Sequence, residues 1–420
     1  MNDMKKILWM LMAAFMTVLA GCSSDNDGPK EDPQDETPWT PNVPMSLTAE
    51  QVAVNSNEVD MAFEIIEDIY DNTSKRDNVL FSPLSKDICM GMIANAVTPE
   101  DRRDMLDKYG FSSVEALNEY SRDRMQYLSY NHSKAKVAFA NSAWANSLTM
   151  TSASDYASVS NVLDKYYGAE SRILDFGKSD VLSLINCWCS DKTNGLIPEF
   201  LKEAPSNQAQ SLIINTLYFD CAWKQPFPKS KSDKLYDFYD EYGQRRCRVH
   251  MMSNNVDIDY VQSDVCSAIR IPYADCNYSA IFAMPRNGNG VKNTTKEILP
   301  SLKQMIVSKA FDSGEKASME VYLPKMTIES SERIDQYICN NGIDLKNKKL
   351  LGFDQSNPIG IQQATFLSLY EEGTRVAAAT SSDYASAPGS LIFDQPFVMI
   401  IQDNNTGSIV LMAVVRMPKE

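Results

Sequence analysis

Histidine is almost absent from this chain, since His132 and His250 are the only two among 420 residues. A nucleophilic serine or cysteine usually needs a base that a third group holds in place. The chain therefore has too few histidines to favour a catalytic triad or a metal centre that depends on them. No Gly-x-Ser-x-Gly, His-Glu-x-x-His or P-loop pattern occurs either. The sequence thus predicts no catalytic residues, no cofactor and no enzymatic activity.

Positive charge is also scarce, because 40 Lys and Arg face 55 Asp and Glu, for a formal net charge of −15. Binding to nucleic acid needs clustered Lys and Arg side chains against the phosphates. We therefore expect no nucleic-acid partner. Acidity of this kind chiefly favours solubility.

The nine cysteines do not form the pattern of a disulfide framework or a metal site. One, Cys22, lies at the end of the N-terminal apolar run, and the others are scattered through apolar segments. Cys187 and Cys189 are two apart, so they would share one face of a strand but not of a helix, and neither arrangement is a zinc spacing. We predict buried free thiols and no metal site. The eight scattered cysteines are Cys89, Cys187, Cys189, Cys221, Cys247, Cys266, Cys276 and Cys339.

The N-terminus has the pattern of a signal peptide, with Lys5 and Lys6 before an apolar run at 7–20 that is short for a membrane span. The run ends in LAGC at 19–22, which resembles a bacterial lipobox. The resemblance implies removal of residues 1–21 and a diacylglyceryl group on Cys22, which would anchor the chain to a membrane without a transmembrane helix. An ordinary secreted protein with a chance cysteine at this position is the alternative.

Residues 22–45 are acidic and rich in proline, a composition that cannot bury a core and predicts a tether. Its acidic start resembles the surface-export signal of Bacteroidetes lipoproteins, which implies an exported outer-membrane lipoprotein and leaves open which side of that membrane it faces. Residues 46–420 show no second linker and no repeat. We therefore expect one large domain there, and a monomer.

Periodicity predicts helices early and apolar strands later, a mixed α and β domain. Val59, Phe63, Ile66 and Tyr70 form one stripe at helical spacing. A short apolar strand at 79–82 is followed by proline, and Ser85 is placed to cap the next helix.

Several short sequence motifs resemble motifs of the serpin family, and they occur in the same order along the chain. They are NVLFSPLS at 78–85, VAFANSAW at 137–144, YYGAE at 166–170, INCWCSDKTNGLIP at 185–198, SLIINTLYF at 211–219, WKQPF at 223–227, IPY at 271–273, LPK at 323–325 and FDQPF at 393–397. The resemblance covers roughly Ser46 to Pro418. It implies a mixed α+β serpin fold with three β-sheets, about eight to nine helices and an exposed reactive-centre loop.

The segment at about 371–390 lies between a predicted strand at 365–370 and one beginning at Leu391, and a connection this long is uncommon without a function. After Gly373 its residues are small and weakly polar, so they can be solvated or buried. The resemblance implies that this is the reactive loop. A protease would cleave it, and before the acyl-enzyme is hydrolysed the loop would enter the large sheet as a new strand. Its hinge would comprise Glu371, Glu372, Gly373, Thr374, Val376, Ala377, Ala378, Ala379 and Thr380.

Strand periodicity would place Thr374, Val376, Ala378, Thr380 and Ser382 on the buried side of that sheet, and none is large or charged. Val376 departs from the alanine usual in inhibitors, which predicts slower insertion.

A second group implied by the resemblance controls opening of the sheet and comprises Ser82, Ser85, Asn215 and Gln363. Gln363 stands where the family has a histidine, and it can donate and accept hydrogen bonds with Asn215 and with Ser82 or Ser85. Ala413 replaces a glycine usual near the C-terminus.

The scissile bond has four candidates. Family spacing from the hinge reaches Ala387, which precedes a proline, whereas counting back from Phe393 reaches Ala385. Small residues would suit an elastase-like protease, and the tyrosine a chymotrypsin-like or papain-like one. The only basic residue of the loop, Arg375, lies too near the hinge for a trypsin-like target. The candidates are Tyr384, Ala385, Ser386 and Ala387.

We therefore expect an inhibitor that traps a serine protease, or a papain-like cysteine protease, as a covalent acyl-enzyme. A non-inhibitory serpin that acts as a binding module or substrate-like decoy is the main alternative. A hydrolase is the third.

Overall fold

The computed structural model describes residues 42–193, 195, 197–232, 234–286, 294–353, 359–374 and 390–419. They belong to one compact unit, Trp39–Glu420. The predicted signal peptide, Cys22 and most of the predicted tether lie outside the described residues. Within these ranges, no helix is both long enough and apolar enough to cross a membrane.

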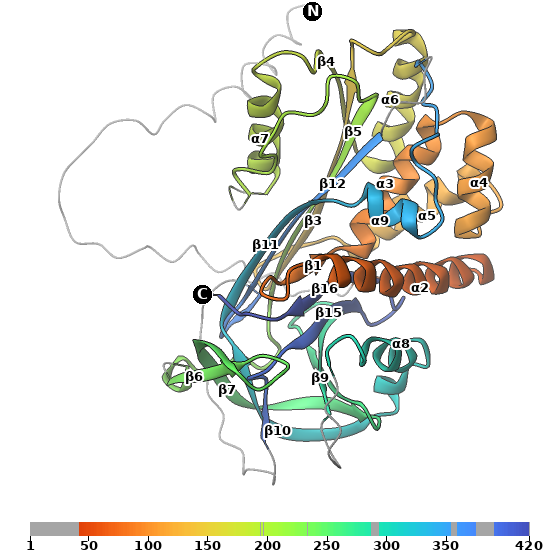
Figure 1. Cartoon of the computed structure of the whole chain (residues 1–420). Helices are drawn as coiled ribbons and strands as arrows, with labels where there is room; N and C mark the ends of the chain where they lie inside the picture. The colour runs from red at the N-terminus through yellow and green to blue at the C-terminus, as the bar shows by residue number, and fades with distance from the viewer. Residues whose placement is uncertain are drawn as a thin grey trace, which may run out of the picture. The chain divides into compact units, whose positions relative to one another are not determined.

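A seven-stranded sheet forms the upper half of this unit (Figure 1). Its main path is β11–β12–β5–β3–β2, with β4 added to β3 and β13 added to β5. β12 runs parallel to β5, and β3 runs antiparallel to it. The strands are β2 (Tyr130–His132), β3 (Ala135–Asn146), β4 (Glu170–Leu174), β5 (Ser211–Ala222), β11 (Met326–Arg333), β12 (Ile359–Leu369) and β13 (Gly373–Thr374).

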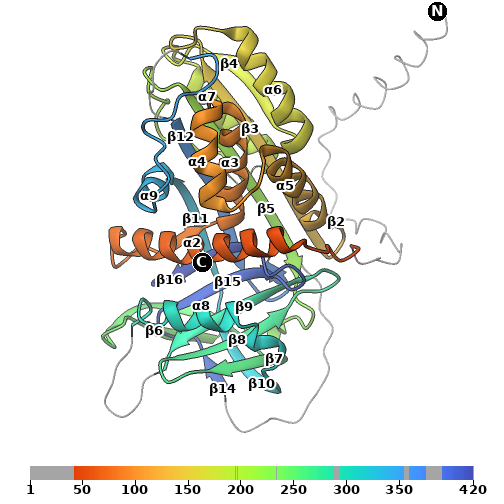
Figure 2. The ribbon, with the colours of Figure 1, turned by 90° about the vertical axis from the view of Figure 1, so that its right-hand side faces the viewer.

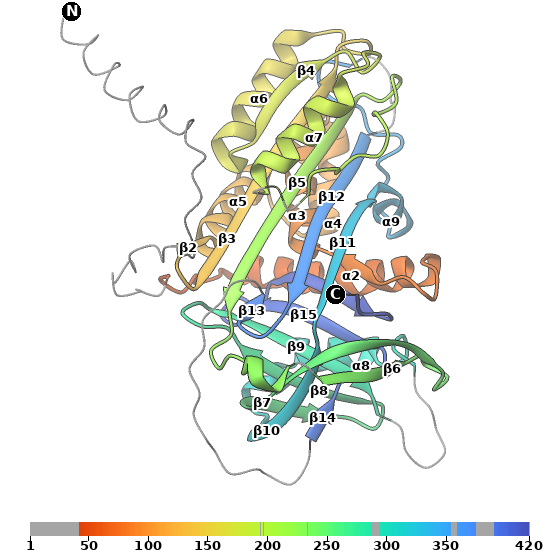
Figure 3. The same cartoon turned by 90° about the vertical axis from the view of Figure 1, so that its left-hand side faces the viewer.

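Helices cover both faces of this sheet. One face carries most of them, and α7 lies alone against the other (Figures 1 and 3). Alternate residues of β5 divide between the two faces, because successive side chains of a strand point in opposite directions. Leu212 and Ile214 pack with Trp188 of α7, whereas Ile213 and Leu217 belong to the main core. The helices around the sheet are α3 (Pro83–Ala96), α4 (Pro99–Tyr109), α5 (Val114–Leu128), α6 (Ala153–Tyr167), α7 (Val181–Lys192) and α9 (Asp335–Asn340).

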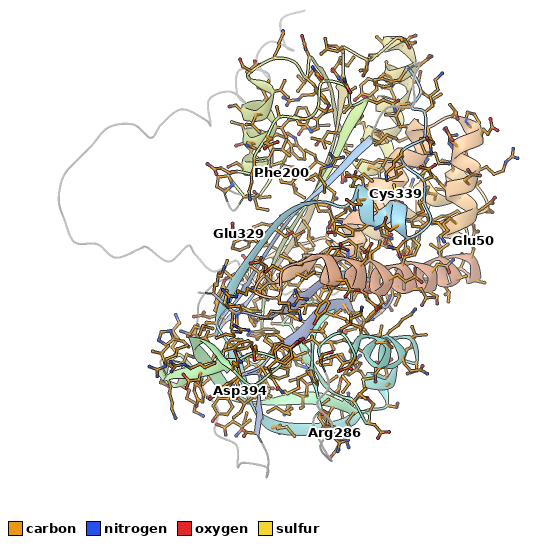
Figure 4. The ribbon with its side chains drawn as sticks, in the orientation of Figure 1. Glu50, Phe200, Arg286, Glu329, Cys339 and Asp394 are labelled. Carbon is orange, nitrogen blue, oxygen red and sulfur yellow. The ribbon has the colours of Figure 1, made fainter. Side chains whose placement is uncertain are left out.

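The α7 side has its own small core. Trp144 and Trp188 meet edge to face at 6.0 Å between ring centroids. Phe200, which lies beside α7 in Figure 4, is fully buried in the same cluster. A helix packed on this face lies over the strands that would have to separate to admit another strand.

The lower half is a nine-stranded network with the order β1–β16–β15–β9–β8–β7–β10–β14, and β6 pairs with β7. The predicted mixed α+β fold is confirmed. The strands join into two hydrogen-bonded networks rather than three separate sheets, because the 18-residue β7 is continuous. The strands are β1 (Val79–Phe81), β6 (Lys234–Tyr239), β7 (Arg245–Gln262), β8 (Cys266–Pro272), β9 (Tyr278–Pro285), β10 (Glu315–Pro324), β14 (Ser390–Ile392), β15 (Phe397–Asp403) and β16 (Ile409–Val415).

Two further helices flank this network, α2 (Ala49–Asn72) and α8 (Leu299–Val307) (Figure 2). The described residues hold eight α-helices in all. The stripe predicted in α2 is buried at Val59, Phe63 and Ile66, and Tyr70 is partly buried against the core.

The predicted cap of α3 is wrong by one turn. Ser82 is the N-cap, and its hydroxyl accepts a hydrogen bond from the backbone N–H of Ser85. Pro83 is the first residue of the helix, a position where proline is favoured because no N–H is needed there.

Candidate functional site

The first residues of the predicted hinge lie inside the seven-stranded sheet. Beyond Leu369 a tight turn reverses the chain, and the backbones of Tyr370 and Gly373 hydrogen-bond to each other at 3.1 and 3.2 Å. Gly373 and Thr374 then form β13, which pairs antiparallel with Ala222 and Cys221 of β5.

β13 occupies the same edge of β5 that β12 uses farther along. Cys221 pairs with Ala135 of β3 on one side and with Thr374 on the other. The register of β12 with β5 ends at Thr365 and Leu217, four positions before Cys221. The hinge thus continues the line of β12 at the end of β5 (Figure 3).

The side chain of Thr374 is buried against an aromatic pair. Its hydroxyl oxygen lies 2.9 Å from the phenol oxygen of Tyr273. The Tyr273 ring stacks on Trp223 at 4.5 Å with an interplanar angle of 8°. The indole N–H of Trp223 donates to the carbonyl of Tyr370 at 3.1 Å, so the pair also holds the turn before the hinge. Burial raises the pKa of Tyr273 well above its ordinary value, which keeps the phenol neutral.

Gly373 is required by close packing of two backbones. A Cβ atom built at this position would lie 2.2 Å from the carbonyl oxygen of Cys221 and 2.6 Å from the Cα of Ala222. Any side chain would therefore push the hinge away from β5. Glycine permits the approach that lets Thr374 reach Tyr273.

Two ion pairs and two backbone hydrogen bonds fix the residues just before the hinge. Glu371 pairs with Lys325 at 2.6 Å and Glu372 with Lys229 at 2.7 Å. Their carbonyls accept from the backbone N–H groups at positions 227 and 223, at 2.7 and 2.8 Å. Both glutamates are buried, at 7% and 6% exposure. Loss of either lysine would therefore leave a buried carboxylate without its counter-charge.

The pKa of Glu371 lies below its ordinary value. Burial by itself would raise it, but the hydrogen bond from the Lys325 ammonium and the charge of that group outweigh burial. The hydrogen bond to Glu372 raises the pKa of Lys229. Both effects favour the charged, paired forms.

The predicted sheet-opening residues lie where α3 meets the sheet. Gln363 of β12 makes two hydrogen bonds with the backbone of Ser82, accepting from its N–H at 3.2 Å and donating to its carbonyl at 2.7 Å. The Ser82 hydroxyl donates to the carbonyl of Val410 in β16 at 2.7 Å. Gln363 therefore ties β12 to the N-terminus of α3 and, through Ser82, to the lower network.

Asn215 is the register partner of Gln363 across β5 and β12, but its side-chain amide donates to Asn141 of β3 at 2.7 Å. Asn141 in turn donates to the carbonyl of Tyr167 at 2.7 Å. Among the described residues, Asn215 Oδ1 and Ser85 Oγ are buried without a hydrogen-bond partner. The four predicted residues are thus close together, with Gln363 bonded to Ser82 and not to Asn215.

Sequence reasoning did not assign roles to Tyr273, Trp223, Lys325 and Lys229. The first three lie in the motifs IPY, WKQPF and LPK, which indicated the family but no contact with the hinge. Their distance along the chain from the hinge hid their contacts with it. The predicted hinge residues from Val376 to Thr380 and the scissile-bond candidates from Tyr384 to Ala387 lie outside the described residues.

Comparison with known proteins assigns the chain to a family. Residues 56–418 match the family model described as Serpin (serine protease inhibitor). Human neuroserpin is 25% identical over 83% of this chain and 88% of its own length, and Iripin-3 of Ixodes ricinus is 26% identical over 82% and 90%. The thermophilic serpin tengpin in its native state has a TM-score of 0.75, with 24% identity over 91% of this chain and 98% of its own.

A ligand-bound structure also has this fold. Thyroxine-binding globulin in complex with thyroxine has a TM-score of 0.75, with 18% identity over 87% of this chain and 99% of its own. Serpins are in general protease inhibitors rather than catalysts, and the family model carries that description. With the match spanning most of the fold and the hinge, this chain belongs to the serpin family.

Proposed function

We propose that this serpin inhibits a serine protease, or a papain-like cysteine protease, by trapping it as a covalent acyl-enzyme through insertion of residues after Gly373 into the seven-stranded sheet. One observation carries the proposal: β13 already occupies a strand position on β5, and the side chain of its residue Thr374 is buried. The hinge lies on the edge of β5, runs antiparallel to it and has small side chains, as a strand that extends into the sheet requires.

Extending the β13 register shows which face each loop residue would take. Because Thr374 opposes Cys221, Val376 would oppose Phe219 and Ala378 would oppose Leu217. These β5 side chains are buried in the main core. In the same register, Thr380 would oppose Asn215 and Ser382 would oppose Ile213. Both of these β5 residues are also buried. The small residues of the loop thus meet the core face, which favours insertion.

Insertion requires β12 to separate from β5. The pairs that must open number seven, from Ile359 with Ser211 to Thr365 with Leu217. Each would be replaced by pairing of the new strand with both neighbours. About a dozen ladder hydrogen bonds at roughly 1 kcal/mol net each favour the inserted form. The uncleaved protein is therefore metastable, held by the barrier to opening.

The target is an elastase-like or chymotrypsin-like protease. Small side chains at Ala385, Ser386 and Ala387 support the first, and Tyr384 the second. Arg375 would take the position opposite Asp220 in the extended register, so cleavage there would leave no strand to insert.

Incubation with elastase, chymotrypsin and a papain-like protease, followed by denaturing electrophoresis, tests the proposal. A protease-sized complex that survives SDS supports trapping. Clean cleavage of the loop without a complex contradicts it and favours a substrate-like decoy. Mass spectrometry of the released C-terminal peptide then identifies the scissile bond.

A second function, ligand binding, is favoured by a cavity of about 370 Å³ between α2, α8 and β15. Val52 and Val307 at its rim are 54% and 53% exposed, and Phe311 lies on its wall. An amphipathic small molecule fits such a site. Enhanced fluorescence of anilinonaphthalene sulfonate that is lost in Val307→Glu would support this function, and equal fluorescence of both proteins would contradict it.

The N-terminal sequence supports export and lipidation at Cys22, and hence attachment to the outer membrane. Metabolic labelling with a radioactive fatty acid tests this part. Label on the wild type and none on Cys22→Ala would support it, and an unlabelled wild type would favour ordinary secretion.

A further inference from the structure

A series of buried hydrogen bonds joins β5 to the helices α3, α5 and α6, which pack side by side on one face of the seven-stranded sheet (Figure 2). The series begins with Asn215, whose side chain donates to that of Asn141, its register partner on β3. Asn141 donates to the carbonyl of Tyr167, the last residue of α6, at 2.7 Å. The Tyr167 phenol then donates to Asn118 Oδ1 of α5 at 2.9 Å. Tyr167 therefore connects the sheet, through its carbonyl, with α5, through its hydroxyl.

Asn118 in turn holds α5 to α3. Its side chain exchanges two hydrogen bonds with the side chain of Asn95, at 2.6 and 2.9 Å. Asn95 also donates to the carbonyl of Gly91 at 2.8 Å. A Cβ atom at Gly91 would lie 2.5 Å from the Tyr167 phenol oxygen, so the glycine leaves room for the tyrosine against α3. The side chains that meet at this junction are all buried.

Other contacts show which elements the junction connects. The Tyr156 phenol donates to the carbonyl of Ala143 at 2.9 Å, and the carbonyl of Tyr167 accepts from β3, so α6 is fixed to β3. The Tyr278 phenol donates to the carbonyl of Leu128 at 2.6 Å, which fixes the end of α5 to the lower network. α3 is fixed to β12 through the hydrogen bonds of its N-cap. The junction thus joins one group of elements around β3 to another group around β12 and the lower network.

Entry of a strand between β12 and β5 would move these two groups apart. β5 must move away from β12 by one further inter-strand spacing, about 4.8 Å. β3 is paired with β5 along that strand, so it must move with β5. The end of α6 at Tyr167 would follow β3, whereas α3 and α5 would stay with β12 and the lower network. The boundary between the two groups then passes through the hydrogen bond of Tyr167 to Asn118.

We propose that Tyr167 is a positioning residue of the inhibitor, and that its hydrogen bond to Asn118 holds the sheet closed and breaks when the reactive loop enters. The inference rests on the proposed function, because it assumes that the loop inserts between β12 and β5. It adds to that function a residue outside the hinge that raises the barrier to opening. Asn118 Oδ1 keeps the hydrogen bond from Asn95 when the phenol leaves, so the junction of α3 with α5 stays intact.

Uptake of a peptide measures opening of the sheet without any protease. The probe is a fluorescein-labelled peptide with the sequence of residues 376–385, and its binding to the folded full-length protein is followed by fluorescence polarisation. Tyr167→Phe keeps the ring and removes only the hydroxyl. We expect this variant to take up the peptide about fivefold faster than wild type, the factor that about 1 kcal/mol of lowered barrier gives.

Tyr156→Phe is the matched control for this experiment. It removes a phenol hydrogen bond between α6 and β3, two elements that would move together. We therefore expect it to take up the peptide at the wild-type rate. Equal rates for wild type and Y167F, no uptake by either protein, or an equal acceleration in both variants would overturn the proposal.

Melting temperatures distinguish a bond that holds the sheet closed from one that only stabilises the fold. Y167F should lower the melting temperature of the uncleaved protein and leave that of the loop-cleaved protein unchanged, because insertion has already broken the bond there. Y156F should lower both. If cleavage raises the melting temperature of wild type but Y167F lowers both forms equally, the proposal is wrong. A protein that traps no protease, but whose Y167F variant takes up the peptide faster, contradicts the inhibitory function and supports the role of Tyr167 in sheet opening.

Discussion

The hydroxyl of Thr374 meets the phenol of Tyr273 at 2.9 Å, inside the protein and at the point where the hinge joins β5. The contact links the first inserted residue to the turn after β8, and so joins the two strand networks through the hinge. In the proposed mechanism, this pairing of the uncleaved protein is the first step of insertion. What remains is the opening of β12 from β5.

Replacement of Thr374 by arginine should convert the inhibitor into a substrate. The guanidinium would have to be buried beside Tyr273 without a counter-charge, which opposes both the hinge pairing and further insertion. We expect cleavage of the loop at an unchanged rate and loss of the SDS-stable complex. Thr374→Ser, which keeps the hydroxyl, is the matched control and should retain the complex. Equal trapping by wild type and T374R would contradict the placement of the Thr374 side chain on the buried side of the sheet.

Gly373→Ala should weaken the hinge contact without adding charge. Its methyl group cannot lie 2.2 Å from the carbonyl of Cys221, so β13 must shift away from β5. We expect protease cleavage near the hinge to become faster in limited proteolysis and the trapped fraction to fall. Gly177→Ala, at an exposed glycine whose added carbon would meet only side-chain atoms, the nearest at 3.2 Å, controls for a general effect of adding a methyl group. An unaltered cleavage pattern for G373A would show that β13 does not pair with β5 in solution.

Gln363→Leu should destabilise the uncleaved protein. It leaves the buried N–H of Ser82 without its partner, at a cost of about 1–3 kcal/mol, whereas the Ser82 carbonyl keeps the hydrogen bond from the Lys86 N–H. Equilibrium unfolding in urea measures the loss. Gln208→Leu, at an exposed glutamine, is the control and should change the free energy of unfolding little. No difference between the two variants would mean that Gln363 does not hold α3 to β12.

The ion pair of Glu371 predicts a pH dependence of stability. The pKa of Glu371 is lower in the folded protein than its ordinary value of 4.5, so the fold favours the carboxylate. Its contribution is therefore complete above about pH 4.5 and is lost as the pH falls through the folded pKa. The free energy of unfolding of wild type should exceed that of Glu371→Gln at neutral pH, and the two values should converge in acid.

Glu329→Gln provides the comparison for that series. Glu329 is an exposed residue of β11, labelled in Figure 4. We expect the difference in free energy of unfolding between this variant and wild type to stay small across the range. If the difference in free energy of unfolding between wild type and E371Q does not become smaller in acid, the stabilising role of the ion pair is contradicted.

Cleavage of the loop should raise the melting temperature, because the freed segment completes the sheet. Scanning calorimetry before and after limited elastase treatment measures the change, and the cleaved T374R variant should show little increase. A wild-type melting temperature that does not change on cleavage would mean that the hinge does not insert.

The fold was largely predictable because its strands are long and apolar. The run at 211–219 became β5, and the predicted strand at 365–370 became the end of β12. Cys187 and Cys189 lie on α7, where the first is exposed and the second buried, because residues two positions apart point to opposite sides of a helix. The cap of α3 was placed wrongly because proline was taken as a stop and not as the first helical residue.

The contacts of the site were less predictable, because they join residues from different sheets. Nothing near Lys325 in the sequence indicates that Glu371 is its partner, and the pairing exists only because β10 ends beside the turn after β12. Gln363 had several possible partners by chemistry alone. Only the position of α3 over the sheet selects the backbone of Ser82.

β13 is a strand of only two residues, and its hold on β5 is correspondingly weak. The same segment of a second molecule presents an identical sequence to the same edge, so it competes for that position at high protein concentration. Donor segment and acceptor edge are different surfaces, so such a head-to-tail exchange extends into open chains wherever the rotation between molecules does not close a ring. The short strand that the proposed mechanism uses therefore also predicts self-association of the protein, which light scattering at rising concentration would detect.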